Sequence, residues 1–201
     1  MKEPDFYTTI ERAGTAELRD RGSRFIAYAF PIAAIVDFKR NLDQVKKEHP
    51  KATHHCFAYR LGLDGDNFRC SDNGEPSGTA GRPILGQIDS RQLTNILVVV
   101  VRYFGGTQLG VPGLINAYKS VTALVLQTIA AVQKPVEMLY QLQFDYTVMN
   151  EVMTVLKNFN CKVKEQESQL FCRMVVGVPK NRLEEVLFRW KELKGLEFTL
   201  I

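Results

Sequence analysis

The chain has 201 residues, of which 45% are hydrophobic and 24% charged, a balance typical of a folded protein that buries one large core or two small ones. The N-terminal sequence MKEPDFYTTI has no apolar run behind its charges, which argues against a signal peptide. The most apolar stretch, Ile96 to Val101, is too short to span a bilayer. We therefore expect a cytoplasmic protein with no membrane partner.

Charge and cysteine content narrow the function classes further. The net charge is +4, and residues 137–201 hold nine Lys/Arg and nine Asp/Glu, so the whole excess lies before residue 137. This distribution favours an anionic partner for the first part, although dedicated nucleic-acid modules are usually more basic. The four cysteines are widely spaced and include no CxxC pair, which predicts reduced thiols rather than a zinc or redox site.

The first part of the chain predicts a mixture of strands and helices. Residues 15–21 and 23–32 are typical of two paired strands joined at Gly22, and the second alternates, with Phe25 and Ala27 on one face. The elements expected next are a helix over 34–48 ending at Pro50, a strand over 54–63, a turn at Asp64-Gly65-Asp66 with a return strand over 67–70, a short helix to about residue 88, a central strand covered on both faces over 95–103, and a helix over 112–132.

The pair Lys134-Pro135 marks the expected junction between a domain of residues 1–134 and a domain of residues 135–201. The second domain predicts a strand over 138–146, a helix over 149–158, strands over 161–166 and 170–178, a helix over 181–191 and a strand over 196–201. This order, βαββαβ, is that of the ferredoxin-like split unit. The predicted fold class is therefore α+β.

A first glycine-rich loop runs from Ser71 to Pro83 and contains many small residues, which indicates an exposed or closely approached backbone. Three interpretations stay open: turn and capping chemistry, binding of an anion or polymer, and catalysis or cation binding by the two carboxylates. The candidate residues are Asp72, Glu75, Ser77, Gly78, Thr79 and Arg82.

A second glycine-rich loop runs from Arg102 to Gly113 and joins the apolar strand to a helix N-terminus, where free N–H groups and the helix dipole favour an anion such as phosphate. Neither GxxxxGK[ST] nor GxGxxG is present, so nucleotide hydrolysis is unsupported. The aromatic side chains are candidates for stacking on bases, or else for the core. The candidate residues are Arg102, Tyr103, Gly105, Gly106, Asn116 and Tyr118.

The run His54-His55-Cys56 suggests metal binding at first sight. On a strand, however, His54 and Cys56 share one face and His55 points to the other, which leaves too few ligands for zinc. We expect no metal and no cofactor. His54 and His55 are retained as candidate polar binding groups beside the loops, and no catalytic residue is assigned.

Three segments carry a specific resemblance: THHCFAYRLG at 53–62, SDNGEPSGTAGRPIL at 71–85 and LTNILVVVVRYFGGTQLG at 93–110. They closely resemble the bacterial YigZ/IMPACT family, with a match over about residues 20–130. The resemblance implies that residues 1–134 are similar to the second domain of ribosomal protein S5, and that residues 135–201 are similar to the ferredoxin-like domain V of translocating elongation factors. It also implies eukaryotic relatives that regulate translation.

One departure from the family pattern concerns the second loop. Where the family usually reads LGAGGLVRAY, this chain has Pro112 in place of Gly and Asn116 in place of Arg. Loss of that cation weakens any phosphate contact made there and lowers its salt dependence.

Three functional hypotheses follow from these patterns. The first is a non-enzymatic protein that binds structured RNA or the ribosome and regulates translation. The second is a protein-interaction module that docks a partner through residues 135–201. The third is a peptidase-type hydrolase that uses Asp72, Glu75, His54 or His55, although no recognised catalytic spacing supports it.

Overall fold

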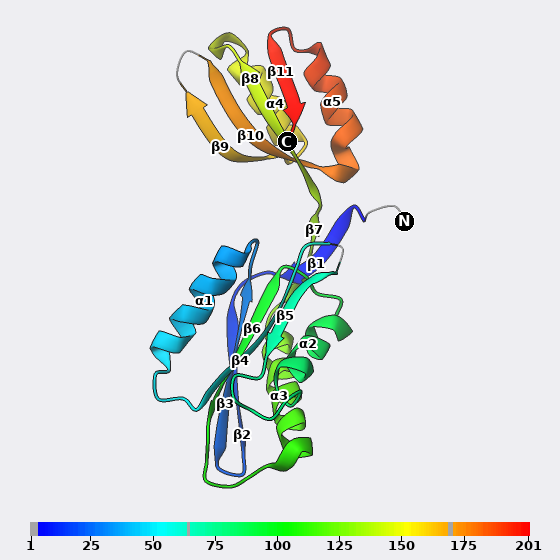
Figure 1. Cartoon of the computed structure of the whole chain (residues 1–201). Helices are drawn as coiled ribbons and strands as arrows, with labels where there is room; N and C mark the ends of the chain where they lie inside the picture. Colours follow the sequence, from blue (N-terminus) through cyan, green and yellow to red (C-terminus); the bar gives the residue numbers. More distant parts are fainter. Residues whose placement is uncertain (1–3, 64, 169–170) are drawn as a thin grey trace. The chain divides into compact units, whose positions relative to one another are not determined.

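The computed structural model describes residues 4–63, 65–168 and 171–201 of the chain (Figure 1). The expected turn at residue 64 and the first residue of the strand expected over 170–178 therefore lie outside the described residues. The chain forms two compact units: one spans Tyr7–Lys134, and the other contains Pro135–Ile201 together with the described residues before Tyr7. Both units combine helices with a β-sheet, so the fold class is α+β.

The unit of residues 7–134 is built on a five-stranded antiparallel sheet in the order β2-β3-β6-β4-β5. The central strand β6 is buried along almost its whole length, because it has neighbours on both edges and helices on both faces. Its elements are β1 (Phe6–Ile10), β2 (Gly14–Asp20), β3 (Ser23–Pro31), α1 (Ile35–Glu48), β4 (His54–Leu61), β5 (Asn67–Ser71), α2 (Gly81–Ser90), β6 (Ile96–Tyr103), α3 (Gly110–Gln127) and β7 (Ala131–Pro135).

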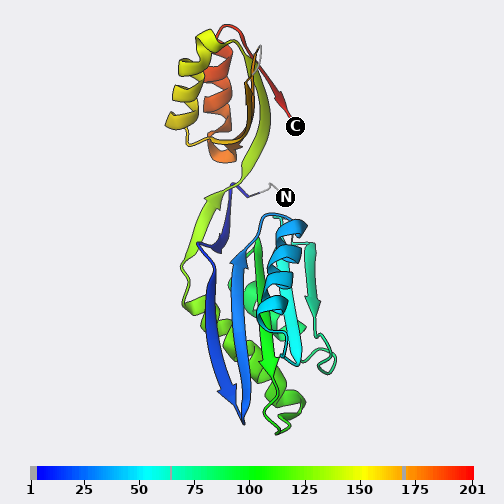
Figure 2. The same ribbon diagram turned by 90° about the vertical axis from the view of Figure 1, so that its left-hand side faces the viewer.

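Two cores flank this sheet, because successive side chains of a strand point to opposite faces. Phe25, Ala27 and Ala29 of β3 pack under α2 and α3, whereas Ile26 on the alternate face packs with α1. Figure 2 shows α1 on one side of the sheet and α3 on the other. The alternation expected for residues 23–32 and the two-sided covering expected for residues 95–103 are confirmed.

The end of the first unit differs from the sequence prediction. The helix expected over 112–132 ends at Gln127, and Ala131–Pro135 instead form β7, which pairs with β1 in a separate two-stranded sheet. Neither strand was predicted, since each is short and the two pair with each other across more than 100 residues of chain. Ile129, which follows the helix, packs against the backbone of Gly14.

The second unit has the element order β8-α4-β9-β10-α5-β11 and a four-stranded antiparallel sheet in the order β11-β8-β10-β9. One face of this sheet packs on α4 and α5 around Trp190, which is fully buried. The elements are β8 (Glu137–Phe144), the 3-10 turn Tyr146–Val148, α4 (Met149–Asn158), β9 (Lys162–Ser168), β10 (Cys172–Pro179), the 3-10 turn Lys180–Arg182, α5 (Leu183–Glu192) and β11 (Leu196–Leu200).

Candidate functional site

The two glycine-rich loops meet at one end of the five-stranded sheet. The register places Arg102, at the end of β6, between Phe25 of β3 and His54 of β4. Gly105, in the second loop, lies so close to Gly22 in the β2–β3 turn that an added Cβ would come within 1.9 Å of its backbone. A side chain at position 105 therefore has no room, which explains the glycine there.

The first loop is held by the carboxylate of Asp72. Its Oδ2 accepts the N–H of Gly78 at 2.8 Å, and its Oδ1 accepts the N–H groups of Ala80 at 2.9 Å and Gly81 at 2.8 Å. These last two groups begin α2, whose N-terminal dipole end is thus occupied by a negative charge of the protein itself. Burial opposes ionisation of Asp72, but the three N–H groups outweigh it and lower its pKa.

The second carboxylate of this loop, Glu75, takes part in a buried ion pair. Its Oε1 lies 2.7 Å from the guanidinium of Arg102 and accepts the hydroxyl proton of Tyr118 at 2.8 Å. The side chains of Glu75 and Arg102 are only 3% and 5% exposed. Each charge therefore neutralises the other, and neither is presented to a ligand.

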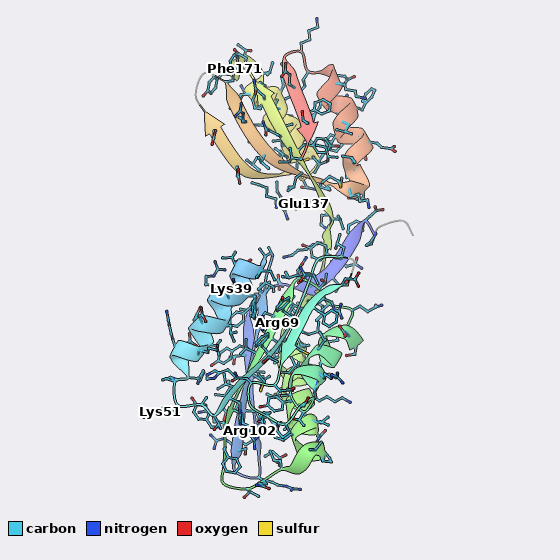
Figure 3. The ribbon with its side chains drawn as sticks, viewed as in Figure 1. Lys39, Lys51, Arg69, Arg102, Glu137 and Phe171 are labelled. Atoms are coloured by element: carbon cyan, nitrogen blue, oxygen red, sulfur yellow. The ribbon has the colours of Figure 1, made fainter. Side chains whose placement is uncertain are left out.

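Arg102, which is labelled in Figure 3, has further polar and aromatic neighbours. Its second terminal nitrogen donates to Ser23 Oγ at 3.3 Å, while its Nε has no hydrogen-bond partner among the described residues. The guanidinium also lies 5.4 Å from the ring centre of Phe25 and 5.5 Å from that of Phe104. This cation links both loops to the β2–β3 turn, because Gly105 N–H donates to the same Ser23 oxygen.

The histidine and cysteine of the HHC run complete this network. His54 Nδ1 donates to the carbonyl of Asn73 at 2.8 Å, and its Nε2 lies 3.8 Å from Glu75 Oε1. The Cys56 thiol donates to the carbonyl of Asp72 at 2.9 Å, and its Sγ lies 3.3 Å from the Tyr118 hydroxyl. Burial raises the pKa of Cys56 to about 12 and also raises that of Tyr118, so both stay protonated.

The residues that the hydrolase hypothesis assigned to catalysis are mostly held in hydrogen bonds of this network. Asp72 and Glu75 accept hydrogen bonds from the protein, and both ring nitrogens of His54 face protein oxygens. His55 lies on the opposite face of the sheet, with Nε2 3.1 Å from the carbonyl of His49, and burial lowers its pKa. In this arrangement these residues fix the loops, and a substrate would have to displace an existing partner of each.

The second loop has a different character. In the part of the chain that the structure describes, no side chain caps the N-terminus of the 18-residue helix α3, and its third residue, Pro112, has no N–H to offer. Phe104 is 50% exposed although one side of its ring faces the Arg102 guanidinium. Asn116 lies on the exposed surface of α3. The loop thus combines an exposed ring with a helix end whose partial positive charge is not neutralised.

The structure brings only some of the predicted residues together. His54, Asp72, Glu75, Arg102 and Tyr118 form one connected network. The Thr79 hydroxyl is buried and donates to the carbonyl of Pro76 at 2.7 Å, and Gly78 adopts a φ of +78°. Ser77, Arg82, Gly105 and Gly106 are exposed in the loops, whereas Tyr103 points to the other face of the sheet.

Sequence reasoning missed residues on both faces of the sheet. Ser23 is fully buried beside Arg102. The sequence feature that could have identified it is a small hydroxyl residue at the first position of an apolar strand. His49 lies between two tyrosines, with Tyr28 Oη 2.6 Å from Nε2 and Tyr103 Oη 2.8 Å from Nδ1. No local pattern could have found this cluster, because its members come from three separate elements.

The Impact N-terminal domain matches residues 21–126 of the chain. The protein belongs to the IMPACT family. The IMPACT family member of Haemophilus influenzae is 33% identical over 89% of this chain and 87% of that protein, and YvyE of Bacillus subtilis is 35% identical over 79% and 73%. The matched segment contains both loops and the whole network of the IMPACT domain.

Two solved structures resemble this IMPACT family member to different degrees. A crystal structure of a hypothetical protein aligns with a TM-score of 0.78 and 29% identity, covering 100% of this chain and 98% of that one. The structure of the two-domain translational regulator Yih1 aligns less closely, with a TM-score of 0.39 and 25% identity over 58% of this chain and 46% of that one.

No group of three or more His, Cys, Asp or Glu side chains among the described residues is arranged to hold a metal ion. None of the helices that the structure describes has both the length and the apolar character needed to cross a bilayer.

Proposed function

We propose that this IMPACT family member is a non-enzymatic protein that binds RNA or the ribosome and modulates translation. The contact surface in this proposal is the second glycine-rich loop with the N-terminus of α3. The observation that carries it is the contrast between the two helix starts: Asp72 occupies the N-terminus of α2, whereas no side chain caps α3. Phosphate oxygens bind well to uncapped N–H groups at a positive dipole end.

The exposed ring of Phe104 supports the same proposal. A half-exposed phenylalanine in a glycine-rich loop loses favourable burial unless a partner covers it. Its position over the Arg102 guanidinium holds the ring in a fixed orientation, and a base stacked on a fixed aromatic ring gains affinity in a sequence-tolerant manner. The positive net charge of residues 1–136 adds long-range attraction for a polyanion.

Finer assignments of fold and cellular role belong to this proposal as well. We infer a ribosomal protein S5 domain 2-like fold for residues 7–134 and a ferredoxin-like fold for residues 135–201. The second inference is supported by the order β11-β8-β10-β9 in a βαββαβ unit, which is the strand order 4-1-3-2. The role in translation and a cytoplasmic location rest on the family resemblance alone, which is an analogy rather than a property of the site.

The test is binding of the full chain to purified ribosomes and to a structured RNA across a salt series. We expect affinity that falls as salt rises, because phosphate contacts release counterions. Phe104→Ala should weaken binding, while Phe68→Ala, which removes an equally exposed ring on β5, should leave it unchanged. Absence of salt-sensitive binding at low ionic strength would rule the proposal out.

A protein partner for the second unit is the other candidate function, favoured by one observation. Phe188 on α5 is 61% exposed, so its aromatic ring is accessible to an apolar surface of a partner. If the unit docks a protein through this helix, Phe188→Ser should abolish capture of that partner by the full chain. Val36→Ser, which changes an exposed apolar residue of α1, is the matched control.

A further inference from the structure

The four-stranded sheet of the second unit ends in an edge strand, β9. In the part of the chain that the structure describes, β9 pairs only with β10, and Figure 1 shows it at the border of its sheet. The N–H and C=O groups on the outer side of an edge strand are a template for pairing with another chain. The residues from Lys162 to Glu167 are all exposed, so this edge is open to a partner.

The charges of β9 are divided between its two halves, with Lys162 and Lys164 in the first half and Glu165 and Glu167 in the second. When two identical strands pair antiparallel, the first half of one lies beside the second half of the other. A twofold axis between residues 164 and 165 places Lys162 opposite Glu167 of the second copy. The same axis places Lys164 opposite Glu165 of the second copy. Opposite charges at facing positions stabilise strand pairing, and symmetry provides each pair twice.

The side-chain directions of β9 fit the same axis because the strand contains a bulge. Val163 lies opposite Val176 and Gln166 lies opposite Met174, and both of these β10 residues belong to the core under the helices. In a regular strand, residues three positions apart point to opposite faces. Lys164 is an extra residue in the bulge, so Val163 and Gln166 share one face. The axis therefore places these two residues opposite each other on the same face of the joined sheet.

The lysines of β9 favour a second copy over an unrelated strand. Lysines usually protect an edge strand, because a neutral or basic strand laid beside them leaves their charges unpaired. Here the Nζ atoms of Lys162 and Lys164 lie 2.9 Å and 2.6 Å from the carboxylate of Glu137, which balances only one of the two charges. Both ammonium groups keep further N–H donors, and the side chains remain 57% and 41% exposed. No ion pair among the described residues engages Glu165 or Glu167.

A groove beside β9 offers apolar surface to the same partner. It has a volume of about 550 Å³ and lies between α4 and the start of β9. Met153 of α4 and Val163 of β9 line it and are 42% and 39% exposed. A twofold axis at β9 brings the same groove of the second copy alongside, so that each copy covers apolar side chains of the other. Their burial adds a hydrophobic contribution to the strand pairing.

We propose that the protein forms a symmetric dimer in which β9 pairs antiparallel with β9 of a second copy and joins the two sheets into one. The interface is isologous, since both copies use the same surface. It is independent of RNA binding by the second glycine-rich loop, which belongs to the other unit. It also differs from docking through Phe188, which lies on α5 rather than on the sheet edge.

Analytical ultracentrifugation of the full chain over a concentration series measures the association. We expect a monomer–dimer equilibrium that weakens as salt rises, because salt screens exposed charge pairs. Glu165→Lys replaces two attractive pairs of the dimer by two repulsive ones and should weaken association about tenfold. Glu197→Lys makes the same charge change at an exposed position of β11, the opposite edge strand, and should leave association unchanged.

Hydrogen exchange locates the interface independently of any variant. As the protein concentration rises through the dissociation constant, the backbone amides of residues 162–167 should exchange more slowly, while those of residues 196–200 on β11 should not change. A dimer whose β9 amides exchange at the monomer rate, or whose affinity is unaltered by Glu165→Lys, uses another surface and overturns the proposal. A chain that stays monomeric up to about 1 mM also overturns it and leaves this edge to a strand of a different protein.

Discussion

The two glycine-rich loops of this IMPACT family member look alike in sequence but differ in how their charges are satisfied. Both leave a strand, contain several glycines and enter a helix. In the first loop, Asp72 neutralises the start of α2 and Glu75 neutralises Arg102. In the second, α3 has no side-chain cap and Phe104 remains half-exposed.

Under the proposed function, this difference separates a structural role from a binding role. A helix N-terminus attracts an anion only while its N–H groups lack a partner, so a carboxylate from the same chain removes that attraction. The first loop therefore stabilises the fold, and the second remains available to a ligand. Substitutions in the first loop should change the free energy of unfolding, whereas those in the second should change binding.

The largest expected effect is on the buried ion pair. Arg102→Met leaves the Glu75 carboxylate buried without its cation and should lower the free energy of unfolding by about 3–5 kcal/mol. Urea denaturation followed by circular dichroism measures this change. Arg82→Met, which removes an exposed arginine that follows the first loop, is the control and should cost less than about 0.5 kcal/mol. Similar values for the two variants would show that the buried ion pair between Arg102 and Glu75 does not stabilise the fold.

The second prediction concerns the carboxylate that caps α2. Asp72→Asn loses charge-assisted bonds to three N–H groups and should destabilise the fold by about 1.5–3 kcal/mol at neutral pH. Thermal unfolding measures the loss. Asp43→Asn, on the exposed side of α1, is the matched control.

The dependence of the free energy of unfolding on acid pH tests the role of the same carboxylate, Asp72. The pKa of Asp72 is lower in the folded state than in the unfolded chain, so its contribution is complete above the unfolded value of about 4. That contribution is lost as pH falls through the folded pKa. The stability difference between wild type and Asp72→Asn should therefore shrink below about pH 4. A difference that stays constant down to pH 2 would show that ionised Asp72 does not stabilise the fold.

Phe104→Ala should show the opposite pattern from the first-loop variants. The ring is half-exposed, so its removal should change unfolding by about 1 kcal/mol or less, while RNA affinity should fall by about 1–3 kcal/mol. Fluorescence anisotropy at fixed salt measures the affinity. Large destabilisation with unchanged binding would place Phe104 in the core rather than at a binding surface.

The smallest expected effect is an increase in the salt dependence of RNA binding. Asn116→Arg restores the cation that the family pattern usually carries on α3, and should increase the salt dependence of RNA binding by about one phosphate contact. The slope of log affinity against log salt measures it. Gln127→Arg, an exposed position at the far end of the same helix, is the control. Equal slopes for both variants would show that the start of α3 does not contact phosphate.

Much of the fold could be predicted from local pattern. The apolar run of β6, the alternation of β3 and the helical spacing of α1 each depend on neighbours a few residues apart. Strands β1 and β7 could not be predicted, because their pairing joins opposite ends of the first unit. The sequence also placed His54 and Cys56 on one face of a strand, as the register has them.

The sequence by itself determined that two polar, glycine-rich segments flank a buried strand and precede helices. It could not determine which carboxylate meets which partner. Tertiary structure decided that Glu75 meets Arg102 and Tyr118 across 27 and 43 residues of chain, and that Asp72 caps α2. Loop residues are paired by the fold that encloses them, so the availability of a charge follows from burial and hydrogen bonding rather than from residue type.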